Sequence, residues 1–418
     1  MKRQIANIIF FTLTLGSQIR IPLSGSSYNL MTAEATLLFI LTLWFLDGQR
    51  IKVDRQFKII AFCWLFVFLW GIIGNYWSEN SMRTTALSLS YLYGLLSFIL
   101  GVAFFEKYRS HSIFSTAVRV FSISLVLQLI YHYLLFYRLN AGYGLAAGVN
   151  EYFYALKIHA AVTLMGSSNY IASFFSFSLI YEFFYRKKHS VIFVFINMAG
   201  LLLTLSRGAI LSVIVVIVLY TFYKFIYSVP TVERRQFIIK IILVFILLYF
   251  VLTQLSSVSN NLLLKSFTLE IFITTIASRL DLLNIAMQDI SKHLLFGTGL
   301  IWAESTDINL FNAHNDFISP FRQQGIIGAL PVLYIILYPF KGIIRGFEST
   351  PRQIKAILLA YAAVALHSLI EPTFYSTTSQ IWLGFVVAYI MVNSRARILK
   401  SEDSLKTSSS SLTMNELD

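Results

Sequence analysis

The chain has 418 residues, of which 57% are hydrophobic, 16% aromatic and 13% charged, and its formal net charge is +13. This composition excludes an ordinary soluble domain, and the single Cys63 excludes both an intrachain disulfide framework and a cysteine metal site. Apolar runs of about 17 to 24 residues recur along the chain, which is the signal of transmembrane helices. The sequence therefore predicts an all-α, polytopic membrane protein.

Hydropathy predicts about twelve spans in a single transmembrane domain covering residues 1–400, followed by a disordered polar tail over 401–418. The first run follows Lys2-Arg3 without a small-residue cleavage site, so we expect it to remain as a span. In chain order the predicted spans cover 5–23, 28–46, 57–74, 84–105, 113–136, 169–185, 190–205, 209–227, 237–255, 325–340, 353–370 and 378–393.

The distribution of lysine and arginine predicts the orientation of these spans. With the N-terminus inside, the inside loops and termini carry 23 basic residues and the outside loops carry nine. Because positive residues concentrate on the cytoplasmic side, both termini are expected to be cytoplasmic. The positive charge then reports topology and not binding to nucleic acid. The two longest loops, 137–168 and 256–324, fall outside.

Two arginines and one histidine on the predicted outer face are candidates for chemistry. Arg207 ends an apolar run just before Gly208, where a snorkelling arginine at a helix end is an equally good reading. Arg279 opens the stretch 279–295, whose apolar spacing predicts a helix lying in the membrane interface. It would bind either a lipid headgroup or a substrate phosphate, which a guanidinium contacts bidentately. His314 is either an ordinary surface histidine or a general base.

Further polar residues are predicted near the same face. Asn315 and Asp316 could orient the ring of His314, and Arg322 could anchor a phosphate or the membrane. Glu371 is at an outer span end, where a solvated carboxylate is the simpler interpretation, and His367 precedes it by about one helical turn. Two further carboxylates, Glu34 and Glu182, lie within predicted spans and are assigned no role.

Several short segments of this half of the chain resemble one known family. They are Leu-Ser-Arg-Gly-Ala at 205–209, Ser-Arg-Leu-Asp-Leu-Leu-Asn-Ile-Ala at 278–286, Leu-Leu-Phe-Gly-Thr-Gly-Leu at 294–300, Ala-His-Asn-Asp-Phe at 313–317 and Gly-Ile-Ile-Gly at 325–328. In this order they resemble the O-antigen ligase/polymerase family of bacterial inner-membrane glycosyltransferases, which have about a dozen helices and a large periplasmic loop. The motif core covers 200–328, and Gly-Ser-Ser-Asn at 166–169 resembles a further family feature.

The resemblance implies a metal-independent, inverting transfer of a glycan from undecaprenyl pyrophosphate to an acceptor hydroxyl at the periplasmic face. It implies that Arg207 and Arg279 bind the pyrophosphate and that His314 acts on the acceptor as a base or positions its hydroxyl. Substrate contacts are expected from Arg322, Asn315, Asn169 and Glu371. No cofactor is expected. No Asp-x-Asp pair occurs in the chain, so a metal site is not expected either.

The acceptor divides this family. A ligase transfers the finished glycan to lipid A–core, whereas a polymerase transfers it to the next lipid-linked repeat, with the same donor and the same catalytic groups. We place the ligase first and keep the polymerase as the alternative. Other polysaccharide-assembly proteins and membrane lipids are expected partners. A flippase or transporter of lipid-linked oligosaccharides remains a second class, although it predicts pseudo-symmetric halves, of which the sequence shows little.

Overall fold

The computed structural model describes residues 20–22, 29–31, 37–38, 41, 51–78, 81–108, 111–139, 168–187, 189–204, 206–228, 269–299, 315–341, 347, 350–374 and 376–414. Apolar stretches of this kind fold as helices because a helix satisfies its own backbone hydrogen bonds where water is absent. The described helices are α3 (Arg55–Ile73), α4 (Ser81–Tyr108), α5 (His111–Leu139), α7 (Ser168–Tyr185), α8 (Ser190–Leu203), α9 (Arg207–Ser228), α12 (Leu269–Lys292), α13 (Ser319–Leu337), α15 (Arg352–His367) and α16 (Thr377–Met414).

Five helical stretches in the described part of the chain are long and apolar enough to cross a membrane. They are Arg55–Tyr76, Thr84–Tyr108, Ser112–Ile130, Arg207–Phe225 and Ser319–Phe340. Four other predicted spans coincide with the helices α7, α8, α15 and α16. The chain is therefore a helical membrane protein. The total of about twelve spans stays a prediction, because span 237–255 and nearly all of span 5–23 lie outside the described residues.

Several boundaries differ from the prediction, and the amphipathic helix α12 begins at Leu269, ten residues before the predicted start at Arg279. Residues Arg20–Pro22 (β1) and Asn29–Met31 (β2) pair as a short antiparallel ladder, so these residues are strands where the predicted spans 5–23 and 28–46 placed helix. Pro22 lacks the amide hydrogen that a helix would use there. Helix α13 starts at Ser319, which shortens the predicted outer loop 256–324. Helix α16 continues to Met414, so residues 401–414 are helical where a disordered tail was expected, since an established helix gains one hydrogen bond for each residue added.

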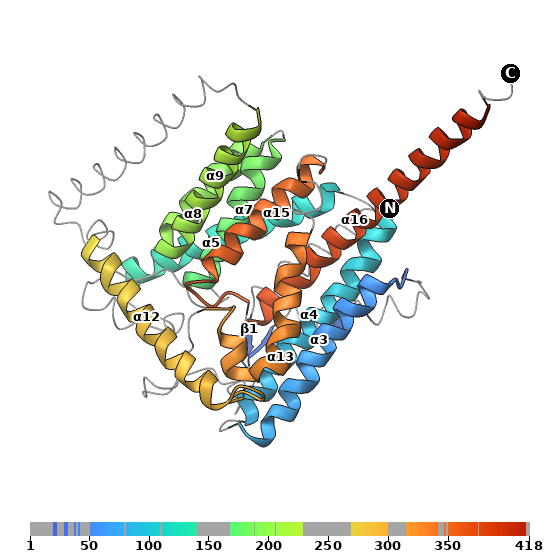
Figure 1. Cartoon of the computed structure of the whole chain (residues 1–418). Helices are drawn as coiled ribbons and strands as arrows, with labels where there is room; N and C mark the ends of the chain where they lie inside the picture. The colour runs from blue at the N-terminus through green and yellow to red at the C-terminus, as the bar shows by residue number, and fades with distance from the viewer. Residues whose placement is uncertain are drawn as a thin grey trace.

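The helices pack around an aromatic core. Tyr389 of α16 contacts Phe105 of α4 edge-on, with ring centroids 5.0 Å apart, and Phe114 of α5 at the same centroid distance. Helix α16 lies along α4, while α7, α8, α9 and α15 form a second group of neighbouring helices (Figure 1). In contrast, α12 runs across the direction of α8 and α9 (Figure 1). Apolar side chains that are exposed on α12 include Leu280 and Met287, as expected for a helix whose apolar face is covered by lipid.

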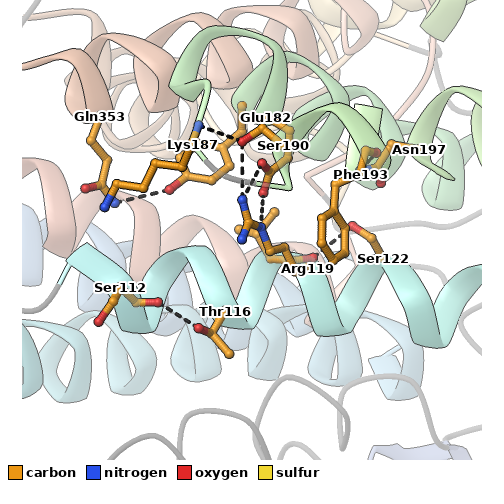
Figure 2. A network of polar contacts seen from close by, with 12 residues as sticks. Ser112, Thr116, Arg119, Ser122, Glu182, Lys187, Ser190, Phe193, Asn197 and Gln353 are labelled. Atoms are coloured by element: carbon orange, nitrogen blue, oxygen red, sulfur yellow. Dashed lines mark hydrogen bonds and ion pairs between the residues drawn. The ribbon is translucent and has the colours of Figure 1, made fainter. Parts of the chain in front are cut away.

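An ion pair within the bundle involves Glu182, to which the sequence assigned no role. Arg119 of α5 donates through Nε and Nη2 to the two carboxylate oxygens of Glu182 on α7, at 2.6 and 2.8 Å, and to Ser190 Oγ on α8 at 3.2 Å (Figure 2). The ring of Phe193 lies 4.8 Å from the guanidinium carbon. The bidentate pair joins α5 to α7, and the bond to Ser190 joins α5 to α8. The Glu182 side chain is fully buried, so this charge depends on Arg119 as its counter-ion.

Replacement of Glu182 by leucine should destabilise the protein by about 3–5 kcal/mol, because Arg119 would keep its charge without a counter-ion. The double variant Arg119→Met/Glu182→Leu removes both charges and should recover most of this loss. The unfolding midpoint in a fixed detergent measures both effects. A single variant as stable as the double one would contradict the assignment of Glu182 as the counter-ion.

A second ionic network lies where the start of α3, the end of α4 and α16 meet. Arg395 donates to Asp54 Oδ2 at 2.6 Å and also pairs with Glu106, while Asp54 caps α3 by accepting from Phe57 N at 2.7 Å. These segments were all predicted to lie on the inner side. Arg395 follows Thr377 by 18 residues, or about 27 Å along a helix, close to the hydrocarbon thickness of a bilayer.

Candidate functional site

The turn that carries Arg207 lies against the end of α15. Ser206 Oγ is 3.4 Å from Nε2 of His367, which is fully buried. A Cβ atom on Gly208 would lie 3.3 Å from Cδ2 of the same ring, so the glycine permits close approach of α9 to α15. Arg207 is thus held at the first position of α9 by contacts on both sides of it, and His367 forms the support behind this turn.

Arg207, Arg279 and Glu371 come together in the folded chain. Arg279 on α12 donates through Nη2 to Oε1 of Glu371, which follows α15. The side chain of Glu371 is 10% exposed and that of Arg279 is 25% exposed. Arg207 interacts electrostatically with both of them. Two guanidiniums that are 72 positions apart in sequence therefore share one partly buried location with one carboxylate.

Asp316 fixes the backbone around Glu371. Its Oδ2 accepts hydrogen bonds from Thr373 N at 2.7 Å, Thr373 Oγ1 at 2.9 Å and Phe374 N at 3.0 Å. Its own amide donates to Ser368 O at 2.9 Å. Since residues 368 and 373–374 flank Glu371 on either side, the carboxylate is presented from a segment that is pinned at both ends. The sequence suggested only that Asp316 could orient the ring of His314.

Asn315 is engaged in the same junction. Its Nδ2 donates to Leu369 O at 3.0 Å, and its Oδ1 accepts from Phe317 N at 2.8 Å and Ile318 N at 3.1 Å. These contacts make it a turn residue ahead of α13, of the kind that asparagine often provides. The preceding residue, His314, lies outside the described residues. Its role at the acceptor stays a prediction.

Asn169 and Arg322 take different positions. Asn169 is half-buried in the first turn of α7, one turn before Ser173, which lines the same cavity as Thr373. Arg322 is buried and points to Asp289 of α12, with Nε and Nη2 at 2.8 and 2.7 Å from Oδ2. The structure thus uses Arg322 to tie α13 to α12, whereas the sequence suggested a phosphate or membrane anchor.

Helix α13 is interrupted at Gly325, and a glycine-containing segment compensates for the break. Gly325 has a φ of +62° and a ψ of −175° inside the helix. The neighbouring segment 294–299 supplies backbone bonds: Ile326 N donates to Leu294 O at 2.8 Å, and Gly299 N donates to Gln323 O at 2.9 Å. A broken helix is tolerated at membrane depth where other groups satisfy its backbone. This pairing joins the Leu-Leu-Phe-Gly-Thr-Gly segment to the Gly-Ile-Ile-Gly segment.

An aromatic group closes this region on the side of α3. Trp70 stacks on Phe296 with ring centroids 5.8 Å apart and an interplanar angle of 18°, and Trp77 packs edge-on against Phe296 at 5.9 Å. Trp70 Nε1 also donates to Gln324 O at 3.0 Å. The two tryptophans therefore brace the segment that supports the break in α13. Their contribution was not found from the sequence, because nothing local links residue 70 to residue 296.

A pocket lies between α7, α15 and α16, next to Thr373. Its lining is almost entirely apolar and comprises Ser173, Phe174, Phe177, Tyr361, Val364, Thr373, Phe374, Ser379, Trp382, Leu383 and Val386. Thr373 connects this pocket to Asp316, because its amide and its hydroxyl both donate to Asp316 Oδ2.

The carboxyl of Asp316 has an unusual environment for a group just outside the α13 span. Burial raises its pKa to about 7, and the negative charge of Glu371 acts in the same direction, whereas the hydrogen bonds from Thr373 and Phe374 act against it. Oδ1 is buried and has no hydrogen-bond partner in the described part of the chain, which is consistent with a carboxyl that keeps its proton near neutral pH.

Asp316 should therefore make the protein less stable as the pH rises. Its pKa in the folded state, about 7, is above the ordinary value of 3.8, so its stabilising contribution is complete below pH 3.8 and is lost as the pH rises through 7. The loss amounts to roughly 4 kcal/mol at most. We expect the unfolding midpoint of the native protein to fall between pH 4 and pH 7 relative to that of Asp316→Asn, which does not titrate. Parallel pH profiles would contradict this.

The charges that converge here are two arginines and a carboxylate, and among the described residues no three His, Cys, Asp or Glu side chains converge as metal ligands. Residues 192–333 match the family model described as O-antigen ligase. The matched segment runs from α8 into α13 and includes Arg207, Arg279 and Gly325. No curated protein sequence matches the chain.

Proposed function

We propose that this chain, whose residues 192–333 belong to the O-antigen ligase/polymerase family, is an O-antigen ligase-type glycosyltransferase. In this proposal it moves a glycan from undecaprenyl pyrophosphate to a hydroxyl of lipid A–core at the periplasmic face of the bacterial inner membrane. The observation that carries the proposal is the convergence of Arg207 and Arg279 beside Glu371. Two guanidiniums in a partly buried site form a strong binding place for a pyrophosphate.

The chemistry follows from where charge develops. The acceptor oxygen attacks the anomeric carbon from the face opposite the pyrophosphate, which inverts that carbon. The bond from the carbon to the pyrophosphate oxygen breaks, and its electron pair stays on the departing pyrophosphate. Arg207 and Arg279 stabilise this charge, and His314 takes the proton of the acceptor hydroxyl or holds the hydroxyl in line. In this proposal the arginines do the work that a metal ion does in other glycosyltransferases.

The contacts at the two ends of the bundle support a periplasmic location for the proposed site. Arg207 lies beside the end of α15, and Glu371 precedes the start of α16. Arg395, at the other end of the apolar part of α16, pairs with Asp54 and Glu106 in segments that the basic residues assign to the cytoplasm. The proposed site then belongs to the periplasmic side, with both termini cytoplasmic. A lipid-linked pyrophosphate suits this side, because the glycan is already activated there.

The test is transfer by the purified, full-length protein from a synthetic undecaprenyl-pyrophosphate glycan, in the presence of EDTA. Lipid A–core and a lipid-linked repeat are offered separately to the native protein and to Arg207→Ala, Arg279→Ala and His314→Ala. Product on lipid A–core that is lost in all three variants is the expected result. Product on the lipid-linked repeat alone would make the protein a polymerase. Donor binding without transfer to either acceptor would favour the transporter.

A further inference from the structure

Glu371 places a negative charge at the point where the proposed function needs a phosphate. Its carboxylate contacts Nη2 of Arg279, and Arg207 interacts electrostatically with both groups. An ion pair of this kind is usually interpreted as a structural tie. Here, however, the pair contains one of the two arginines proposed to bind the donor. The carboxylate of Glu371 and the pyrophosphate of the donor would therefore compete for the same guanidinium.

The contact between Arg279 and Glu371 leaves part of the guanidinium unused. One nitrogen, Nη2, donates to one oxygen, Oε1, which is an end-on contact and not the bidentate fork that the two groups can form. The Nε atom of Arg279 is buried and lacks a hydrogen-bond partner among the described residues. A buried donor without an acceptor is costly. The guanidinium therefore has a donor that Glu371 leaves unsatisfied and that a phosphate oxygen would satisfy.

The backbone that carries Glu371 is anchored on both sides of this residue. The Glu371 amide donates to His367 O at 3.0 Å, and the Thr373 amide donates to Asp316 Oδ2 at 2.7 Å, so the backbone is held on both sides. Pro372 lies between these anchors and further restricts the chain. Rotation of the Glu371 side chain alone would release Arg279.

The balance of charge favours exchange. Arg207 and Arg279 repel each other, and the carboxylate of Glu371 offsets this repulsion with one negative charge. A pyrophosphate carries more negative charge and more acceptor oxygens than a carboxylate, so it can contact both guanidiniums at once. Glu371 would thus keep the two arginines together, and the donor would replace this internal anion with one that binds both arginines more strongly.

We propose that Glu371 is the resident counter-ion of Arg279, and that the pyrophosphate of the donor displaces it on binding. This inference rests on the proposed function, because it identifies what the donor must replace in that site. Glu371 is then a positioning residue that keeps the arginines in place between reaction cycles. It also weakens the binding of other anions to Arg279, because each of them must displace the carboxylate first.

Binding of inorganic pyrophosphate to the purified full-length protein, measured by calorimetry in one detergent, tests this proposal. Glu371→Gln keeps the size of the side chain and removes its charge, and it should bind pyrophosphate about tenfold more tightly than the native protein. The matched control is Glu106→Gln, which removes the same charge from an arginine pair at the other end of the bundle and should leave the affinity unchanged. Addition of Arg279→Ala to Glu371→Gln should abolish the tighter binding of pyrophosphate.

Each alternative outcome has a definite meaning. Equal or weaker binding by Glu371→Gln would overturn the proposal, because the carboxylate would then assist the anion and not compete with it. Absence of pyrophosphate binding in both proteins would overturn it as well, whereas the proposed function fails only if glycan transfer by the native protein is also absent. If Glu371→Gln does not fold, Glu371→Asp is used in its place. Its shorter side chain holds the charge farther from Arg279, so it should bind pyrophosphate more tightly than the native protein.

Discussion

Arg279→Ala is expected to lower the rate of glycan transfer by about three orders of magnitude, because a fixed charge that stabilises the departing pyrophosphate acts most strongly in the transition state. Arg279→Lys should recover only part of this loss, since an ammonium cannot contact two oxygens in the planar fork of a guanidinium. The rate is measured with the undecaprenyl-pyrophosphate donor at saturating acceptor. Arg352→Ala is the control, because that guanidinium is exposed and donates to Phe184 O at the start of α15.

The effect on the rate must be separated from an effect on folding. Arg279→Ala removes the guanidinium that contacts the partly buried carboxylate of Glu371, which should lower the unfolding midpoint. The double variant Arg279→Ala/Glu371→Gln removes the remaining charge, so it should recover the midpoint without recovering transfer. Transfer by either variant at more than a third of the native rate would contradict the role of Arg279 in the chemistry.

Gly325→Ala is expected to cause the largest loss of stability of any small substitution in the described chain. A Cβ atom at this position would lie 2.1 Å from the carbonyl oxygen of Leu295, and the φ of +62° is strained for any residue other than glycine. The neighbours are backbone atoms of the segment that completes the break in α13, so they cannot move aside without breaking their hydrogen bonds. We expect a loss above about 5 kcal/mol, seen as little folded protein.

The control for this substitution is Gly74→Ala at the end of α3. A Cβ atom there would meet Trp77 at 3.7 Å, which is an ordinary contact, and the backbone is in the right-handed helical region. Its yield and unfolding midpoint should match those of the native protein. Folded Gly325→Ala with a native unfolding midpoint would show that the break in α13 can be accommodated by other means.

Hydropathy located the helices well because it is a local property. Each of the helices α3, α4, α5, α8 and α9 lies where an apolar run predicted it, within a few residues. The start of α13 was missed by six residues, since Arg322, Gln323 and Gln324 suggest a loop. These polar residues are buried in the structure, where Asp289 pairs with the charge of Arg322 and the segment 294–299 donates to the backbone carbonyls of Arg322 and Gln323.

The candidate site was predicted in part. Arg207, Arg279 and Glu371 were all singled out from the sequence, and the structure brings them together. Asp316 was recognised only as a neighbour of His314, although it holds the segment that carries Glu371. His367 was noted for its spacing of one helical turn from Glu371. The spacing could not show that its ring supports the turn before Arg207, because Ser206 is 161 positions away.

The sequence by itself determined that the protein is a helical membrane protein, where most of the described helices lie, and which short motifs carry unusual residues. These features depend on the length of each apolar run and on the residue types at adjacent positions. Each can therefore be predicted from one segment of the chain alone. Only the tertiary structure decided the partners: Glu182 for Arg119, Asp289 for Arg322 and Glu371 for Arg279. A buried charge needs a counter-ion, but any helix that packs nearby can supply it, so its identity depends on the packing of the whole bundle.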